Sequence, residues 1–483
     1  MRRERKEKNV SILYVTSEAA PFSASGGLGD VMGALPQAVT SASPEDHVSV
    51  ILPYYKNKVP ETLSKNFKFV TEFRFRYVWR EAYAGIFSAE LGGVTYYFVD
   101  NEQYFLRSGY YGEFDDGERF AYFSMAVIEF MLRMDKIPDV LHANDWQTAL
   151  TVVYLRTKYA RVEQLRSVKT VYTIHNIEYQ GKFDPAILGD IFGLDDVYRQ
   201  VVEYDGCVNL MKGAIVVADR VTTVSPNYAC ELRQAYFAFG LQHVINANGH
   251  KLSGIINGID TVYFSPDKGG DIVFPYSLSD VWEGKAKNKA ALQNELGFRV
   301  RRDVPLVVMI TRLARAKGVD LLTCILDELL GADMQFVILG TGDADYEKTL
   351  TEIAERHPDK MRALIKFDRA LSKRLYASAD IFLMPSRTEP CGLAQMIACS
   401  YGTIPVVRAV GGLYDTIIPY GQEGANGFVF NNYNAHELLF RVKDALSLYR
   451  NSDEWGKLIS GAMKTDFTWD RSAKKYLSLY RGL

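Results

Sequence analysis

Short runs of apolar, often β-branched residues alternate along this chain with longer stretches of amphipathic helical pattern. Strands alternating with helices in this way are typical of α/β units built around parallel sheets. The alternation runs through the first half and starts afresh in the second, so we predict two successive doubly wound domains. The strand candidates are residues 11–16, 48–53, 94–100, 139–144, 169–175 and 220–225, then 305–312, 334–340, 363–367, 380–386 and 403–409.

The length of the chain points the same way, because 483 residues are too many for one hydrophobic core. Glycine, proline and aspartate punctuate residues 260–285, which indicates a linker. We therefore expect an N-terminal domain at 1–265 and a C-terminal domain at 266–465. A final helix within 466–483 is expected to cross back to the first domain.

Composition argues against several classes of partner. The 56 lysines and arginines stand against 58 acidic residues, so no global field recruits nucleic acid or an anionic membrane. The five cysteines form no CxxC pair, which suits a reducing cytosol. The apolar run near the N-terminus is too short for a signal peptide, and no run approaches the roughly 18 apolar residues of a membrane helix. We expect a cytoplasmic protein.

Two consecutive glycines, Gly26 and Gly27, separate the first strand candidate from a helical stretch in "PFSASGGLGD", residues 21–30. The pair makes either a tight turn or a place where backbone N–H groups approach an anion. The motif lacks the Lys-Ser/Thr ending of a P-loop and the spacing of a dinucleotide-binding fingerprint. ATP hydrolysis and nicotinamide binding are therefore disfavoured, and we expect no cofactor.

Polar residues follow the strand candidates, and ligands of doubly wound sheets bind beyond the carboxyl ends of the strands. Taken singly, each residue has an alternative as a core histidine, a helix cap, a solvated loop pair or a first-turn acid. Together they predict one ligand site with cations, an acid and glycine turns. The residues are Asp145, Trp146, His175, Asn176, Arg312, Lys317 and Glu389, then Cys391, Gly392 and Leu393 at a helix start and Gly411 and Gly412 in a second glycine turn.

The residue types indicate what this ligand is. Arg312 and Lys317 offer a planar fork and a compact charge, which suit phosphate. Glu389 and a neutral His175 suit sugar hydroxyls. Phosphate plus sugar predicts a nucleotide sugar. Residues 343–345 form a D-x-D pattern, but Asp343 and Asp345 stand between a strand and a helix, so we interpret them as caps and predict no metal.

Several longer motifs occur in order along the chain, among them "YVTSEAAPFSASGGLGDVMGALP", "HANDWQTAL", "YTIHNIEYQG", "TRLARAKGVDLL" and "PSRTEPCGLAQMIACSYGTIPVVRAVGGLYDT". With them the chain resembles bacterial glycogen synthases and plant starch synthases. The resemblance implies the GT-B fold, in which two Rossmann-like domains face each other across a deep cleft. It also implies transfer of glucose from ADP-glucose to the non-reducing end of an α-1,4-glucan, with retention of configuration.

The resemblance implies catalytic roles for five residues. Arg312 and Lys317 would grip the diphosphate, and Glu389 would face the donor sugar. His175 would lie beside the glucose 6-hydroxyl, and Asp145 near donor and acceptor. Further donor contacts implied are Gly26, Gly27, Asn257, Phe367 (stacked on the base), Cys391, Gly392, Leu393, Gly411 and Gly412. The implied acceptor contacts are Asp30, Trp146, Asn176 and Tyr110 or Tyr111.

Three positions depart from the family pattern: Ala24 where lysine is usual, Val410 where threonine is frequent, and Lys366 where glycine is. The missing cation at Ala24 motivates one alternative, a glucan-binding or regulatory homologue with weak catalysis. Another GT-B glycosyltransferase is the second alternative. No nucleophile stands out in the motifs, so we favour attack on the face from which the leaving group departs. The departing diphosphate would then help to remove the acceptor's proton.

Overall fold

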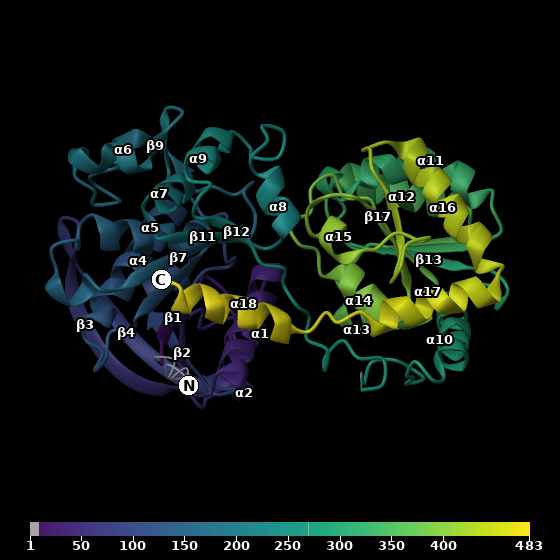
Figure 1. Cartoon of the computed structure of the whole chain (residues 1–483), viewed down its shortest axis with the longest axis horizontal. Helices are drawn as coiled ribbons and strands as arrows, with labels where there is room; N and C mark the ends of the chain where they lie inside the picture. The colour runs from purple at the N-terminus through teal and green to yellow at the C-terminus, as the bar shows by residue number, and fades with distance from the viewer. Residues whose placement is uncertain (1–8, 269) are drawn as a thin grey trace, which may run out of the picture. The chain divides into compact units, whose positions relative to one another are not determined.

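The computed structural model describes residues 9–268 and 270–483, which divide into two compact units (Figure 1). Unit 1 contains the chain up to Val224, Ala229–Gly258 and Trp469–Leu483, and unit 2 contains Ser225–Tyr228 and Ile259–Thr468. The division after Gly258 corrects the boundary expected after residue 265. Ile259 belongs to unit 2 because its N–H donates to the carbonyl of Phe467, 2.9 Å away.

Unit 1 is built around a nine-stranded sheet in the order β12-β11-β7-β6-β1-β2-β5-β4-β3. The strands pair in parallel except at β4, which is antiparallel to both its neighbours. The central strands are buried along their length, as expected where helices cover both faces. The bounds are β1 Ser11–Val15, β2 His47–Pro53, β3 Lys68–Tyr77, β4 Arg80–Leu91, β5 Val94–Asp100, β6 Val140–Asn144, β7 Lys169–Ile174, β11 Arg220–Thr223 and β12 Leu252–Gly254.

The strand order of unit 1 reverses between β1 and β6. β1 pairs with β2 on one side and with β6 on the other, and later strands add outward from each. In doubly wound sheets, ligands bind beyond the carboxyl ends of the strands at such a switch point. The loops that follow β1 and β6 are therefore the first candidates for a site in this unit.

Helices flank the sheet of unit 1. α1 (Gly27–Ala42) and α18 (Trp469–Arg481) lie side by side, whereas α4 (Asp116–Met131), α5 (Trp146–Arg156) and α7 (Leu210–Val217) form a separate packed row (Figure 1). A small sheet joins β8 (Lys182–Phe183), β10 (Cys207–Asn209) and β9 (Glu203–Tyr204). The other helices between β1 and β12 are α2 Glu61–Ser64, α3 Glu102–Phe105, η1 Glu163–Leu165, η2 Pro185–Ile187, η3 Asp196–Tyr198, α6 Arg199–Val202, α8 Pro226–Glu231 and α9 Gln242–Ala247.

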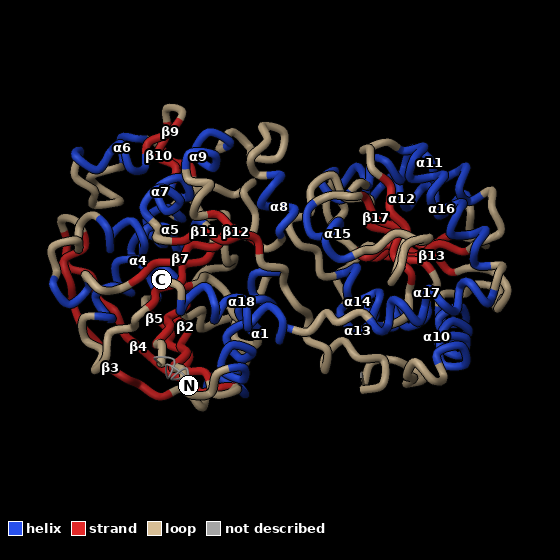
Figure 2. Tube along the Cα trace, viewed as in Figure 1, coloured by secondary structure: helices blue, strands red, loops and turns tan. Residues whose placement is uncertain are grey.

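Unit 2 contains a parallel six-stranded sheet in the order β15-β14-β13-β16-β17-β18, with helices on both sides of the strands (Figure 2). Its strand order reverses between β13 and β16, so the loops after these two strands meet at a second switch point. The strands are β13 Leu306–Ile310, β14 Gln335–Leu339, β15 Met361–Leu364, β16 Ile381–Met384, β17 Ile404–Arg408 and β18 Phe428–Phe430. The helices are α10 Val281–Glu295, η4 Arg315–Lys317, α11 Val319–Leu330, α12 Ala344–Arg356, α13 Arg369–Ser378, α14 Ala394–Ser400, α15 Gly411–Thr416, α16 Ala435–Tyr449 and α17 Ser452–Lys464.

Most strand candidates fall on strands, and the differences have physical reasons. The candidate at 363–367 is displaced, because β15 begins at Met361 and ends at Leu364, and Phe367 lies in the following loop. The hairpin β3–β4, the small sheet and the short strands β12 and β18 were not among the candidates. They are edge elements with mixed or very short apolar runs, which periodicity does not distinguish from loops.

The C-terminal helix α18 completes the core of unit 1. Trp469, Ala473, Tyr476, Leu477 and Tyr480 are buried, and their spacing is that of one helix face. They pack with buried residues of α1 and of the strands in a single hydrophobic cluster. The helix that ends the chain is therefore part of the first unit's interior.

A buried polar chain also connects α18 to the sheet. The hydroxyl of Tyr480 lies 2.8 Å from that of Tyr14 and 2.8 Å from Nδ1 of His142. Nε2 of His142 lies 2.5 Å from the hydroxyl of Thr173. Burial lowers the pKa of His142 to about 3. The imidazole is therefore neutral at physiological pH and serves as a hydrogen-bonding group.

We expect Tyr480→Phe to lower the free energy of unfolding by about 1–3 kcal/mol, because Tyr14 and His142 both lose a buried partner. Urea unfolding of the variant measures this change. Tyr236→Phe is the matched control, since that ring is 52% exposed in the same unit. An equal effect of the two substitutions would show that the Tyr480 hydroxyl contributes nothing particular.

Candidate active site

The first glycine turn, Gly26–Gly27, lies at the switch point of unit 1. The buried carboxylate of Glu18 holds the residue that precedes it. Glu18 is 2% exposed, and its carboxylate accepts hydrogen bonds from the N–H and the hydroxyl of Ser25. Gly26 is the N-cap of α1, and a Cβ added to Gly26 or Gly27 would meet no atom within 4 Å. No described residue accepts a hydrogen bond from the N–H of either glycine. The turn therefore presents free donors and open space to a ligand, as anion sites at helix N-termini do.

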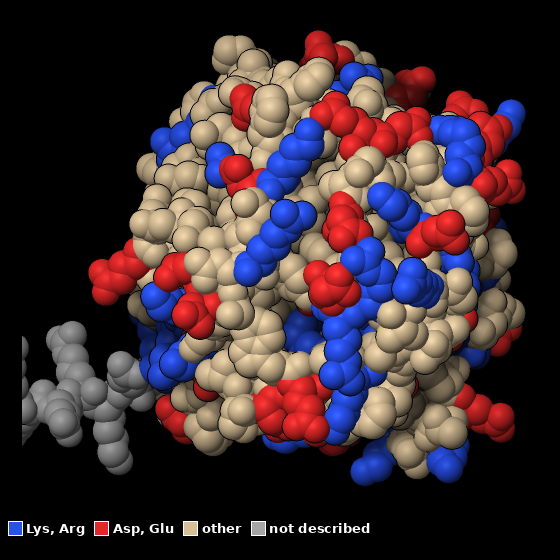
Figure 3. Space-filling model, turned by 90° about the vertical axis from the view of Figure 1, so that its right-hand side faces the viewer, with Lys and Arg blue, Asp and Glu red and all other residues tan. Residues whose placement is uncertain are grey.

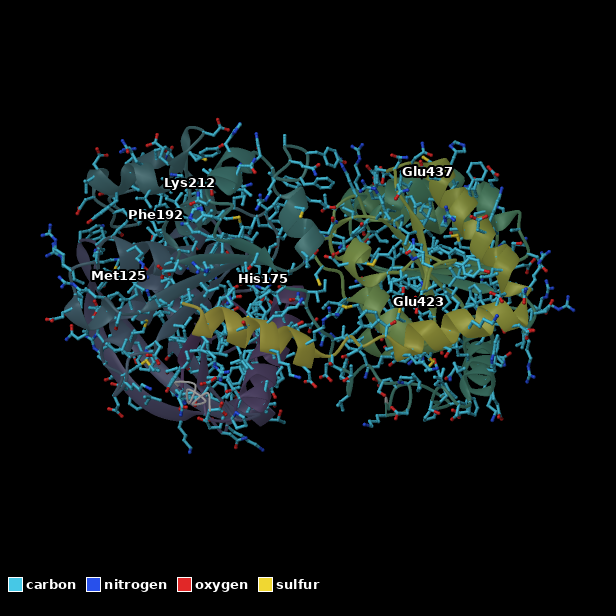
Figure 4. All side chains as sticks on the ribbon, viewed as in Figure 1. Met125, His175, Phe192, Lys212, Glu423 and Glu437 are labelled. Atoms are coloured by element: carbon cyan, nitrogen blue, oxygen red, sulfur yellow. The ribbon has the colours of Figure 1, made fainter. Side chains whose placement is uncertain are left out.

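Asp145 follows β6 at the same switch point and organises the loop after β7. It has a φ of 57°, an uncommon conformation for a non-glycine residue. Its Oδ1 accepts from the N–H of His175 at 2.8 Å and from that of Asn176 at 3.4 Å. Nε2 of His175, labelled in Figure 4, lies 2.9 Å from Oδ1 of Asn144. Asp145 occupies the N-cap position of α5 but makes no capping hydrogen bond to it, so the alternative of a helix cap is wrong in its contact.

The protonation of these two residues is set by their surroundings. Desolvation lowers the pKa of His175 to about 3, so its imidazole is neutral at physiological pH. Desolvation also raises the pKa of Asp145 to about 7, and the nearby Glu18 carboxylate adds to the rise. The two backbone N–H donors act in the opposite direction. The cluster therefore offers a neutral hydrogen-bonding ring beside an acid that titrates near neutrality.

The expected acceptor contacts divide into partly exposed and structurally engaged side chains. Asp30 lies in the first turn of α1, and the side chain of Asn176 accepts from the N–H of Glu178. Trp146 packs against Phe120 and Phe183, although part of it stays exposed. Tyr111 donates its hydroxyl to Glu18, while Tyr110 is half-buried and bonds with the backbone of Ala24. The two tyrosines thus hold the glycine loop in addition to any ligand contact.

Among the expected donor contacts, Asn257 is 5% exposed, and its Oδ1 has no hydrogen-bond partner among the described residues.

In unit 2, two loops meet at the switch point through an ion pair. Nζ of Lys317, at the end of η4, lies 2.6 Å from Oε2 of Glu389, in the loop after β16. The hydroxyl of Ser386 donates to the same oxygen at 2.9 Å. The guanidinium of Arg312 is exposed and has no ion-pair or hydrogen-bond partner among the described residues. Glu389 precedes α14 by more than a turn, so the alternative of a first-turn acid is wrong.

The second glycine turn differs from the first, because the loop of Glu389 fills the space beside it. A Cβ on Gly411 would lie 1.9 Å from the carbonyl oxygen of Glu389, and one on Gly412 would lie 2.1 Å from that of Cys391. The N–H of Gly412 donates to Glu389 at 3.1 Å. These glycines are needed for packing, and the Gly412 N–H is not free for a ligand. This corrects the expectation that the second turn repeats the first.

Leu393 is the N-cap of α14, and Gly392 has a φ of 74°.

Two further expectations concern loops at the same edge of this sheet. Phe367 follows β15 and is 81% exposed, so its ring is available for stacking. Asp343 is the N-cap residue of α12, but its side chain makes no capping hydrogen bond, and Glu347 instead accepts from the N–H of Gly342 at 2.8 Å. The capping interpretation of Asp343 is therefore wrong in its contact. Among the described residues, no group of three or more His, Cys, Asp or Glu is arranged to hold a metal ion.

Sequence reasoning missed three supporting residues, Glu18, Asn144 and Ser386. Each lies at or just beyond the end of a strand and contacts an expected site residue or its loop. The strand-end rule that pointed to Asp145 and Glu389 covers them as well. The sequence alone does not single them out, because Ser and Asn are frequent in loops and because a single glutamate is usually a surface residue.

We expect Asp145→Asn to stabilise the protein more at pH 8 than at pH 4.5. The pKa of Asp145 is raised in the folded state, so the cost of its charge is absent below the ordinary value of 3.8 and grows as pH rises to about 7. The neutral asparagine avoids that cost. Thermal unfolding at both pH values measures it, with exposed Asp190→Asn as the control. A stability difference independent of pH would contradict the raised pKa.

We expect Gly27→Ala to unfold like the parent chain and Gly412→Ala to lose about 1–3 kcal/mol, because only the second methyl group meets occupied space. Chemical unfolding of both variants checks the contrast. Similar losses in the two would mean that the first turn is packed as tightly as the second.

Comparison with known proteins identifies the family to which the whole chain is similar. The family model described as starch synthase catalytic domain matches residues 11–247, and the one described as glycosyl transferases group 1 matches residues 297–458. Glycogen synthase from Streptococcus mutans serotype c is 45% identical over 98% of this chain and 100% of its own length. Glycogen synthase from Exiguobacterium sibiricum is 44% identical over 98% of this chain and 99% of its own.

Solved structures of similar proteins point to the same family and fold. The catalytic domain of starch synthase IV from Arabidopsis thaliana, bound to ADP and acarbose, superposes with a TM-score of 0.90 at 34% identity, covering 98% of this chain and 99% of that one. Sucrose-phosphate synthase from Thermosynechococcus elongatus shares the fold alone, with a TM-score of 0.61 at 18% identity, covering 98% and 99% of the two chains. Full-length identity to glycogen synthases, the two matched family models and the GT-B fold show that the chain belongs to the glycogen/starch synthase family of glycosyltransferases.

Proposed function

We propose that the protein transfers glucose from ADP-glucose to the non-reducing end of an α-1,4-glucan, with retention of configuration. The observation that carries this proposal is the segment after β13, which presents the unpartnered guanidinium of Arg312 and, five residues on, Lys317 in its ion pair with Glu389. Two cations and a carboxylate beyond the ends of parallel strands suit a diphosphate that carries a sugar. The starch synthase IV structure with ADP supports the choice of nucleotide.

Each cluster has a proposed task. Arg312 and Lys317 bind the diphosphate, and Glu389 accepts hydrogen bonds from the sugar hydroxyls. The exposed ring of Phe367 stacks on the base. In unit 1, the neutral His175 and Asp145 bind the transferred glucose and the incoming hydroxyl. The nucleotide-sugar domain is thus unit 2, and unit 1 is the acceptor domain.

The reaction follows from what these groups stabilise. The bond between glucose C1 and the diphosphate oxygen breaks, and its electron pair leaves with ADP. The 4-hydroxyl of the acceptor bonds to C1 on the same face, and its proton passes to a diphosphate oxygen. Negative charge grows on the leaving group in the transition state, where fixed cations stabilise it most. The protein thus accelerates the reaction chiefly through Arg312 and Lys317.

Location and other partners follow from the sequence and the surface. The face of unit 2 in Figure 3 carries both signs of charge interspersed, which suits a neutral polysaccharide better than nucleic acid. Among the described helices, none is long and apolar enough to cross a membrane. We place the reaction in the cytoplasm because the five cysteines are all free thiols.

A glucan-binding homologue with weak catalysis is the second candidate, and Ala24 is the observation that favours it. A Cβ on Gly29 would lie 2.5 Å from the Cβ of Ala24, so this position packs against α1 and supplies no cation. Binding of glucan without transfer would support this candidate.

Purified protein incubated with radiolabelled ADP-glucose or UDP-glucose and a glucan primer tests the function, with and without EDTA. We expect incorporation from ADP-glucose that survives the chelator. Arg312→Ala should keep its fold and lose at least about a hundredfold in turnover, the scale of a lost transition-state donor. Lys348→Ala, which removes a cation 76% exposed in the same unit, is the control. Near-normal turnover of Arg312→Ala at saturating donor would remove the diphosphate assignment.

A further inference from the structure

A tyrosine outside the motifs lies against the turn that carries Lys317. Tyr433 belongs to the short loop between β18 and α16, and its hydroxyl lies 3.0 Å from the carbonyl oxygen of Arg315. The same hydroxyl contacts the carboxylate of Asp320, in the first turn of α11. Arg315 begins η4, and Lys317 ends it. Tyr433 therefore holds both ends of the segment that presents Lys317.

On its other side, Tyr433 faces a cation that holds the loop of Glu389. The guanidinium of Arg408 lies 5.5 Å from the centre of the Tyr433 ring, within cation–π range. Nη1 of Arg408 donates to the carbonyl of Arg387 at 2.7 Å, and Nε donates to that of Asn431 at 3.2 Å. Arg408 is 9% exposed, so these contacts are shielded from water. The arginine thus fixes the backbone two residues before Glu389.

The loop of Tyr433 is itself rigidly anchored. Asn434 caps α16 by accepting from the N–H groups of His436 and Glu437. Glu437, labelled in Figure 4, accepts from the N–H of Asn432 at 2.9 Å. Burial and the adjacent Asp320 raise the pKa of Tyr433 above its ordinary value of 10.0. The phenol therefore keeps its proton at neutral pH and remains a donor in a fixed place.

We propose that Tyr433, in cation–π contact with Arg408, is a positioning residue that sets the separation of Lys317 and Glu389 for the donor diphosphate sugar. The proposal rests on the proposed function, since it assigns the pair to the donor. Tyr433 touches neither residue of the pair. It connects their two loops, and small displacements of charged groups about a diphosphate cost large factors in binding and rate.

Tyr433→Phe tests the proposal, because it removes the hydroxyl and keeps the ring beneath Arg408. We expect the KM for ADP-glucose to rise about tenfold, the KM for glucan to stay unchanged, and ADP affinity by calorimetry to fall about tenfold. Tyr449→Phe is the matched control, since that hydroxyl also donates to a backbone carbonyl of unit 2, Arg302, at 3.3 Å. Its donor KM should match that of the parent.

Three results would overturn the proposal: an unchanged donor KM and ADP affinity in Tyr433→Phe, an equal rise in the glucan KM, or the same effect in Tyr449→Phe. Arg408→Lys keeps the charge but loses the two hydrogen bonds to the carbonyls of Arg387 and Asn431. It is measured in the same way should Tyr433→Phe not fold. An unchanged donor KM in Arg408→Lys also counts against the proposal. Failure of the proposed function looks different. The parent chain would then transfer no glucose from ADP-glucose, while calorimetry with ADP would still compare the variants.

Discussion

The ion pair between Lys317 and Glu389 is the interaction on which the arrangement of the strand-end loops of unit 2 depends. The Glu389 side chain is only 7% exposed, and burying a carboxylate is costly unless a charged partner or hydrogen bonds compensate for the lost water. Lys317 supplies that partner from another strand end, so the two loops must approach closely. Glycines make the approach possible: a Cβ on Gly318 would lie 2.2 Å from the carbonyl oxygen of Pro385, and Gly411 and Gly412 abut the loop of Glu389 in the same way. The close packing of backbone serves the contact between charges.

The two units use one architectural device for different chemistry. Each carries its cluster at the point where the strand order reverses, beyond β1 and β6 in one sheet and beyond β13 and β16 in the other. Unit 1 offers free backbone donors, a neutral histidine and an acid that titrates near neutrality. Unit 2 offers cations. Under the proposed function, the cations suit the charged phosphates of the donor, and the neutral groups suit an uncharged sugar.

Much of the fold, and the clustering of polar residues beyond the strand ends, could be predicted from the sequence, because buried parallel strands are apolar runs whose carboxyl ends meet at one edge of a sheet. Asp145, His175, Lys317 and Glu389 followed from that rule. The roles of the glycine pairs did not, since a sequence shows the absence of a side chain but not what fills its place. The position of Tyr433 could not be predicted for a related reason, because its partners, Arg315 and Arg408, are far from it along the chain.

The return of α18 to unit 1 has a consequence for how the protein is made. The hydroxyls of Tyr14 and Tyr480 meet across a separation of 466 residues. A chain emerging from the ribosome N-terminus first therefore exposes an unfinished apolar face on its first unit until α18 (Trp469–Arg481) has been synthesised. Unit 2, contiguous apart from a four-residue segment, is free to fold earlier. We therefore expect unit 1 to complete its native core after unit 2 during translation, although most of unit 1 is synthesised first.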